Sequence, residues 1–275
     1  MAESRESVLA GRGILVTRAA AQSGELCREL EARGAKPIAV PMLRFELPEE
    51  TSTLDAELRR LARFDWWLLT SQNAVAFAVR RGAQIGVNVA EAARRVRVIA
   101  VGPATAEAAR EAGIRVERVA REHLGVKLAE EIADELRGEK VLLLRSDLAD
   151  SRLPAKLREI GAQVSDVMAY RTLPPGREEL QALSEICWKE VAAALFFSPS
   201  AARHFAGGVG LPVLRREAKH LLLVAIGPVT LEAVRELGLE RTAQARDASV
   251  AAIVGALEES LKDAAVGGSS GAQRR

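Results

Sequence analysis

The sequence contains few cysteines and no long apolar run. Its two cysteines, Cys27 and Cys187, stand far apart, which argues against a disulfide framework and against a cysteine-rich metal site. The best uncharged run, residues 191–202, is shorter than the roughly 18 residues that a membrane-spanning helix needs. The first residues carry acids and lack an apolar segment of the kind found in secretory signals. We therefore expect a cytoplasmic protein that does not enter a membrane.

The chain also lacks a large net charge and the signature motifs of several functional classes. The 39 Lys and Arg against 37 Asp and Glu give a net charge of +2, too little for a broad field that would hold nucleic acid. Neither Gly-x-Gly-x-x-Gly nor Gly-x-x-x-x-Gly-Lys-Ser/Thr occurs, which disfavours dinucleotide and nucleoside triphosphate binding. The histidines lack metal-ligand spacing, so no metal site is expected. Gly-x-Ser-x-Gly is absent, which argues against a serine hydrolase.

Short apolar runs alternate with amphipathic stretches along the 275 residues, a length at which one core often divides into two domains. We expect strands at residues 13–17, 37–40, 66–70, 96–101, 116–119, 140–145, 164–169, 192–197, 221–226 and 240–243. We expect helices at residues 22–33, 72–80, 105–112, 127–136, 154–160, 230–237 and 250–261. This alternation predicts an α/β fold with parallel sheets.

An internal repeat organises these elements. Residues 102–114 match residues 227–239 at eight of thirteen positions, with an offset of 125. Residues 70–74 match residues 197–201 at an offset of 127, and further matches at that offset pair Arg18 with Arg145 and Arg44 with Arg171. Because the matches keep one order and nearly one offset, they indicate duplication of a roughly 125-residue α/β unit.

Small polar residues and glycines recur where the predicted strands end. Ligands of parallel sheets bind at the carboxyl ends of strands, clefts between domains often take small molecules, and helix starts attract anions. An unliganded βα turn or a helix cap would explain the same residues equally well. The candidates for ligand binding are Ser71, Gly102, Thr105, Ser198, Gly227 and Thr230.

Tyr170 is the single tyrosine of the chain and stands near the end of a predicted strand, just before Pro174 and Pro175. A lone tyrosine usually packs in a core. At a junction between domains, however, its phenol could donate a proton into a cleft.

Six segments together resemble the uroporphyrinogen-III synthase family, over about residues 11–262. Ala19 departs from the family pattern, because many members have proline there. The segments are residues 13–18 (GILVTR), 68–75 (LLTSQNAV), 100–105 (AVGPAT), 167–172 (VMAYRT), 196–200 (FFSPS) and 225–230 (AIGPVT).

The resemblance implies two similar flavodoxin-like domains with a cleft between them and crossed connectivity. The repeat alone suggests sequential halves, divided near residue 138. The family instead implies a discontinuous first domain of residues 1–40 and 174–275, and a second domain of residues 48–164. Residues 41–47 and 165–173 would be the strands of a two-stranded linker, which places Tyr170 in the hinge, facing the cleft.

The resemblance also implies an activity. The family cyclises hydroxymethylbilane to uroporphyrinogen III, with loss of water and inversion of ring D, in the biosynthesis of haem, sirohaem or cobalamin, and it uses no cofactor. Tyr170 would assist proton transfer to the leaving hydroxyl. Residues implied to bind substrate are Ser71, Gly102, Thr105, Ser198, Gly227 and Thr230, with Arg18 and Arg171 as further carboxylate contacts. We expect a monomer, to which the preceding deaminase of the pathway could hand the substrate.

Two alternatives belong to other functional classes. Duplicated α/β units around a cleft also describe non-catalytic proteins that bind or sense a small ligand or a tetrapyrrole. A nucleotide-binding α/β protein is the second alternative, which the missing glycine-rich motifs disfavour.

Overall fold

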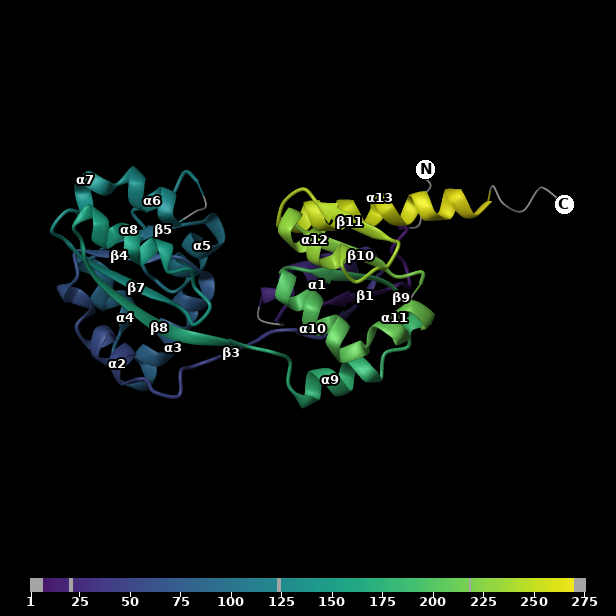
Figure 1. Cartoon of the computed structure of the whole chain (residues 1–275), viewed down its shortest axis with the longest axis horizontal. Coiled ribbons are helices and arrows are strands. Elements are labelled where there is room, and N and C mark those ends of the chain that lie inside the picture. Colours follow the sequence, from purple (N-terminus) through teal and green to yellow (C-terminus); the bar gives the residue numbers. More distant parts are fainter. Residues whose placement is uncertain (1–6, 20–21, 123–124, 218, 270–275) are drawn as a thin grey trace. The chain divides into compact units, whose positions relative to one another are not determined.

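The computed structural model describes residues 7–19, 22–122, 125–217 and 219–269 (Figure 1). The chain divides into two compact units. Unit 1 consists of Met1–Arg44 and Pro174–Arg275, and unit 2 consists of Phe45–Leu173. Each unit contains one sheet, and the pairings among β1, β2, β9, β10 and β11 and among β4, β5, β6, β7 and β8 are parallel.

The sheet of unit 1 has the order β11-β10-β9-β1-β2. Its strands are β1 (Gly13–Val16), β2 (Lys36–Ala39), β9 (Val191–Phe196), β10 (Leu222–Ile226) and β11 (Thr242–Ala245). One face packs on α9 (Arg177–Ser184), α10 (Pro199–Val209), α11 (Leu211–Glu217) and α12 (Pro228–Arg235). The other face packs on α1 (Gly24–Ala32) and α13 (Val250–Ser269). A short η4 (Trp188–Glu190) leads into β9.

The sheet of unit 2 has the order β3-β8-β7-β4-β5-β6. Its strands are β3 (Arg44–Glu46), β4 (Trp66–Leu69), β5 (Arg97–Ala100), β6 (Arg118–Val119), β7 (Lys140–Ser146) and β8 (Gln163–Leu173). One face packs on α2 (Ser52–Arg59), η2 (Leu61–Arg63), α3 (Gln72–Gln84), α4 (Val89–Ala92), η3 (Ala93–Arg95) and α5 (Pro103–Glu111). The other face packs on α6 (Gly125–Glu131), α7 (Ala133–Leu136) and α8 (Arg152–Ile160).

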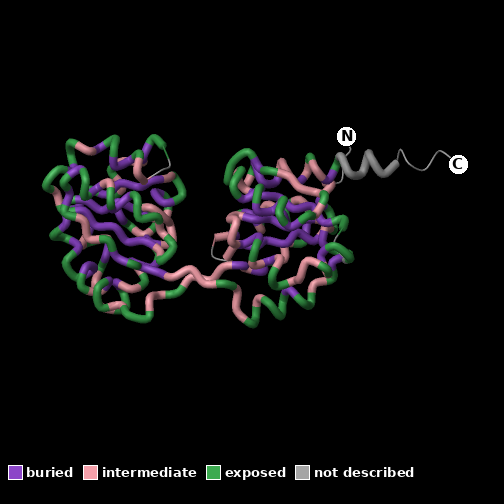
Figure 2. The backbone as a smooth tube through the Cα atoms, in the orientation of Figure 1, coloured by how far each residue is buried: buried purple, intermediate pink, exposed green. Residues whose placement is uncertain are grey.

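Helices on both faces explain why the central strands are apolar without interruption. Every residue of β1 and β4 is buried, as Figure 2 shows for the middle of each unit. Within β4, Trp67 and Leu69 enter the core on one face, while Trp66 and Leu68 enter the core on the other. Strands buried on both faces lose the alternation of apolar and polar residues that marks a half-exposed strand.

The two sheets share one arrangement of repeated strands. By the repeat, β7 and β8 correspond to β1 and β2, and the series β4, β5, β6 corresponds to β9, β10, β11. With these equivalences the order β2-β1-β9-β10-β11 of unit 1 recurs as β8-β7-β4-β5-β6 in unit 2. Unit 1 thus combines two strands of the first sequence repeat with three of the second, and unit 2 combines two strands of the second with β3, β4, β5 and β6 of the first. A division at residue 138 would split both units.

Some boundaries differ from the sequence-based expectation. A linker strand is expected to begin at residue 165. The strand found there, β8, begins at Gln163 and pairs with β7 as far as Tyr170. On its other side β8 lies next to β3. The helix expected at 127–136 is two helices, because the backbone leaves the helical region at Ile132 (φ −115°, ψ 21°). The last strand, β11, begins two residues later than expected.

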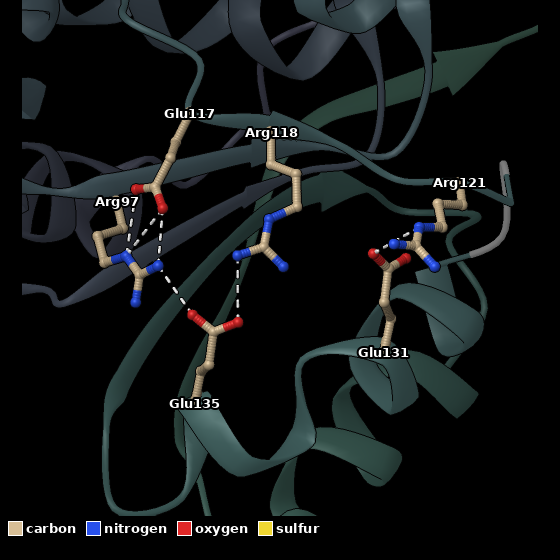
Figure 3. A network of polar contacts seen from close by, with 6 residues as sticks. All are labelled: Arg97, Glu117, Arg118, Arg121, Glu131 and Glu135. Atoms are coloured by element: carbon tan, nitrogen blue, oxygen red, sulfur yellow. Dashed lines mark hydrogen bonds and ion pairs between the residues drawn. The ribbon is translucent and has the colours of Figure 1, made fainter.

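A polar network covers the β5–β6 edge of unit 2 (Figure 3). Nη2 of Arg97 lies 2.7 Å from a carboxylate oxygen of Glu117 and 2.8 Å from one of Glu135, which also accepts from Arg118 at 3.1 Å. The hydrogen bond from Arg97 holds the pKa of Glu117 below its ordinary value. The Arg97 guanidinium also lies 3.9 Å from the ring centroid of Trp66. The network thereby ties the short edge strand β6 to α7 and to the adjacent core.

Candidate active site

The strand order of unit 2 reverses direction between β7 and β4, and a ligand crevice is expected at such a point. A cavity of about 560 Å³ opens there, at the carboxyl ends of the strands. Its lining residues are Thr70, Ser71, Val101, Gly125, Val126, Lys127, Arg145, Ser146, Ala149, Asp150, Arg152, Leu153 and Tyr170. The cavity therefore lies where the sequence places the candidate residues of β4 and β8.

Tyr170 lines this cavity while its ring packs in the core. The side chain is 6% exposed, and its ring stacks on Phe77 at a centroid distance of 5.4 Å and an interplanar angle of 21°. Phe45 meets the same ring edge-on at 5.7 Å. These two contacts fix the ring, so that the phenol oxygen lies 3.2 Å from Oγ of Ser71.

Ser71 has two hydrogen-bonding partners. It is the N-cap of α3, where its Oγ accepts from the backbone N–H of Ala74 at 3.1 Å. The same oxygen is the one that meets Tyr170. The cap therefore fixes the oxygen that in turn orients the phenol, so a helix cap and a candidate catalytic contact coincide in one side chain.

Arg145 lines the cavity as well, although it is not among the site residues predicted from the sequence. Its Nε and Nη2 donate to the two carboxylate oxygens of Asp166 at 2.8 and 2.6 Å, and its Nη1 donates to the carbonyl of Asp150 at 2.7 Å. The signal that could have found it is the repeat, because Arg145 is the counterpart of Arg18. In the structure Arg145 holds the chain between β7 and α8.

The charged side chains at the cavity form ion pairs. Lys127, Arg145 and Arg152 line it, against one acid, Asp150. Hydrogen bonds from Arg152 hold the pKa of Asp150 below its ordinary value, so that carboxylate stays ionised at neutral pH. Lys127 donates to Glu130 at 3.0 Å. Arg145 pairs with Asp166, so each of the three cations has a carboxylate partner and the charges at the lining are balanced.

Gly102 and Thr105 lie at the start of α5, after the neighbouring strand β5. Gly102 is the N-cap in an extended conformation, and Pro103 follows in the first turn. Thr105 is 7% exposed and does not line the cavity, whereas Val101, which directly precedes Gly102, does. The structure therefore places these two residues beside the cavity wall and not in it.

In unit 1 the corresponding turns have the same construction. Ser198 is the N-cap of α10, and its Oγ accepts from the N–H of Ala201 at 3.2 Å. Gly227 precedes α12 with a φ of 86°, a conformation that favours glycine, and Thr230 is 4% exposed within the first turn of that helix. These turns follow the carboxyl ends of β9 and β10, as the sequence predicts.

Arg18 follows β1 and lines a second hollow, of about 270 Å³, within unit 1. Its guanidinium lies 5.2 Å from the ring centroid of Phe197, and its Nε donates to Gln22 at 3.0 Å. Burial lowers the pKa of Arg18 from its ordinary value. Arg171 instead pairs with Glu49 at 2.5 Å and is not among the residues lining either hollow.

The structure thus brings part of the predicted set together. Ser71 and Tyr170 share one cavity with Arg145, and Arg18 lines a hollow of the other unit. The remaining candidates do not line these cavities: Gly102, Thr105, Arg171, Ser198, Gly227 and Thr230. Within the described ranges, no cluster of three His, Cys, Asp or Glu could hold a metal ion, and no described helix is long and apolar enough to cross a membrane.

Known proteins match most of the chain. The family model described as uroporphyrinogen-III synthase HemD matches residues 24–255. The chain belongs to the uroporphyrinogen-III synthase family. The uroporphyrinogen-III synthase of Chlorobaculum parvum is 26% identical over 229 residues, which cover 82% of this chain and 90% of the relative. That of Synechococcus elongatus is 28% identical over 237 residues, which cover 84% and 89%.

Solved structures of the family have the same fold. A mutant uroporphyrinogen III synthase from the extremely thermophilic bacterium Thermus thermophilus superposes with a TM-score of 0.56 at 20% identity, covering 92% of this chain and 99% of that one. The Helicobacter pylori enzyme gives a TM-score of 0.54 at 18% identity, covering 93% and 99%. Family, relatives and fold together indicate a uroporphyrinogen-III synthase of tetrapyrrole biosynthesis, a cyclising hydro-lyase, as the sequence predicts.

Proposed function

We propose that this chain converts hydroxymethylbilane to uroporphyrinogen III, with loss of water and inversion of ring D, and that the cavity of unit 2 is where the hydroxyl leaves. Family membership supports the reaction. The observation that carries the assignment to this cavity is the buried Tyr170, which lines it together with Ser71 and whose hydroxyl lies 3.2 Å from Oγ of Ser71. A phenol that is fixed by packing and open to a cavity is suited to proton transfer.

In the proposed reaction Tyr170 donates a proton to the departing hydroxyl, which leaves as water. Electrons from the adjacent pyrrole nitrogen break the C–O bond, and loss of the pyrrole N–H proton leaves a neutral azafulvene while the phenolate of Tyr170 takes up a proton again. General acid catalysis contributes about 10²–10⁴-fold when fully expressed, and the push from the pyrrole lowers that demand. The remaining task is to hold a flexible chain of rings in a shape that closes with ring D inverted.

The carboxylates of the substrate are proposed to bind at the strand ends of both units. In unit 2 the proposed contacts are Lys127 and Arg152, which would exchange their carboxylate partners for those of the substrate, and Ser71, Gly102 and Thr105 lie at adjacent helix starts. In unit 1 the proposed contacts are Arg18, Ser198, Gly227 and Thr230, and Arg171 is a further candidate. Helix starts offer unpaired N–H groups and a favourable dipole to anions.

Further parts of the proposal concern the setting of the reaction. No cofactor is needed, because the step is an elimination of water followed by ring closure. We propose a cytoplasmic monomer that receives its substrate from the preceding deaminase. Two free cysteines, of which Cys187 is exposed, suit a reducing compartment.

The test is to incubate the purified chain with hydroxymethylbilane and to separate the uroporphyrinogen isomers. Spontaneous closure gives isomer I, so the reaction without protein is the control. Isomer III as the main product supports the proposal. Isomer I alone, at the rate of the control, contradicts it, and tight substrate binding without isomer III would identify a non-catalytic tetrapyrrole-binding protein instead.

A further inference from the structure

The strand that carries Tyr170 has an irregularity just before that residue. The parallel register of β7 and β8 pairs Arg145 with Met168 and then Ser146 with Tyr170, so that β8 advances two residues while β7 advances one. Ala169 is the extra residue. Such a bulge is uncommon between parallel strands and redirects the side chains that follow it.

The bulge decides on which face of the sheet Tyr170 lies. Side chains of a regular strand alternate between faces, which would place Tyr170 on the side of Met168, itself 44% exposed. Instead Val167, Ala169 and Tyr170 all enter the same core. The shift by one residue therefore directs the phenol onto Phe77 and its hydroxyl toward Ser71.

Asp147 holds the bulged strand at Tyr170 and at Thr172. Its backbone N–H donates to the carbonyl of Tyr170 at 3.1 Å, and its Oδ1 accepts from the N–H of Thr172 at 2.9 Å. The pairing between β7 and β8 ends at Tyr170, so the exposed Asp147 carboxylate supplies the acceptor that a longer β7 would have offered to Thr172. Its position is itself fixed by a turn, in which Oγ of Ser146 accepts from the N–H of Leu148 at 2.9 Å.

We infer that Asp147 is a positioning residue, which keeps the bulged end of β8 in the register that aims the Tyr170 hydroxyl into the cavity. This inference rests on the proposed role of Tyr170 as the proton donor. Asp147 itself is not among the residues lining the cavity, so its effect passes through the backbone of residues 170–172. Small misplacements of a reacting group lower the rate steeply, by about 10²-fold for roughly 1 Å.

The variants Asp147→Ala and Asp147→Asn separate positioning from folding. Alanine removes the acceptor for Thr172, whereas asparagine keeps a side-chain oxygen at the same place. Asp147→Ala removes only one of several constraints on Tyr170. We therefore expect it to lower kcat by about ten-fold, which is less than the roughly 10²-fold loss for a displacement of about 1 Å. KM should change little. Asp147→Asn should restore most of the lost turnover. Asp134→Ala, which removes an exposed carboxylate on α7 of the same unit, is the control and should retain kcat.

A double-mutant cycle with Tyr170→Phe shows whether Asp147 acts through the phenol. In the Tyr170→Phe background, Asp147→Ala should cause no further loss of kcat. An equal loss in both backgrounds, or wild-type kcat for Asp147→Ala, would overturn the inference while leaving the role of Tyr170 intact. Wild-type kcat for Tyr170→Phe would overturn the proposed proton donor, and this inference with it.

A spectroscopic readout is available because the chain has one tyrosine. Protein labelled with a carbon isotope at the tyrosine Cζ gives a single resonance that belongs to Tyr170. We expect this resonance to shift or broaden in Asp147→Ala and to keep its wild-type position in Asp147→Asn and Asp134→Ala. An unchanged resonance in Asp147→Ala would contradict a positioning role even if turnover fell.

Discussion

Replacing Ser71 with alanine removes two hydrogen bonds from one side chain, and their contributions can be separated. The cap on α3, accepted from Ala74 at 3.1 Å, is worth about 1 kcal/mol. The bond with Tyr170 is neutral and lies beside the cavity, where water can replace it, so we assign it about 0.5 kcal/mol, the low end for an intramolecular hydrogen bond. Ser71→Ala should therefore lower the free energy of unfolding by about 1.5 kcal/mol.

Asn88 provides a matched control in the same unit. Its Oδ1 caps α4 by accepting from Glu91, also at 3.1 Å, and it does not line the Tyr170 cavity. Asn88→Ala should cost about 1 kcal/mol and leave kcat unchanged. Ser71→Ala should in addition lower kcat by about two-fold, because a lost bond of roughly 0.5 kcal/mol no longer orients the phenol.

The assay is urea unfolding of the full chain followed by tryptophan fluorescence, since two of the three tryptophans, Trp66 and Trp67, are buried in unit 2. Initial rates of uroporphyrinogen III formation give kcat. Equal destabilisation by Ser71→Ala and Asn88→Ala, together with unchanged kcat in both, would refute the reasoning. Ser71 would then be a helix cap and nothing more.

Three further predictions concern the second unit, the topology and pH. Thr230→Ala should lower kcat/KM by roughly ten- to a hundred-fold if its hydroxyl binds a substrate carboxylate, whereas a purely structural role would lower only Tm. A fragment of residues 45–173 should unfold cooperatively in urea while residues 1–138 should not fold; cooperative folding of the latter would favour sequential domains. Arg81 lowers the pKa of Asp55, so this pair stabilises the fold above the ordinary Asp pKa of about 3.9, and the stability is lost as pH falls through the lowered value. The Tm difference between Arg81→Gln and wild type should therefore be larger near pH 7 than near pH 3, and an equal difference at both would contradict it.

The sequence predicts the strands well because strands that are buried on both faces are continuous runs of apolar residues, as in β4 and β10. It predicts the turns after them because glycine, proline and small polar residues have local reasons to stand there, as Gly227 does with its φ of 86°. Local signals suffice for both. The correspondence between the strands of the two sequence repeats is likewise predicted from local sequence matches.

The composition of the cavity is harder to predict, because it depends on contacts between distant residues. Arg145 acquires its place through Asp166, 21 residues away, and Ser71 meets Tyr170 across 99 residues. The bulge at Ala169 leaves no pattern that distinguishes it from a regular strand end. Arg171 directly follows Tyr170 in the sequence, yet the structure pairs it with Glu49 and leaves it outside both hollows.

The most direct test of the account is the turnover and product of Tyr170→Phe. Phenylalanine keeps the ring stacked on Phe77, so the free energy of unfolding should change little. Loss of the general acid should lower kcat by roughly ten-fold or more, toward the low end of the range for such catalysis, because the pyrrole already assists departure of the hydroxyl. Uroporphyrinogen III should remain the enzymatic product, since the shape of the site controls ring inversion. Wild-type kcat in Tyr170→Phe would contradict the account, because the proton would then come from water or from a carboxyl group of the substrate.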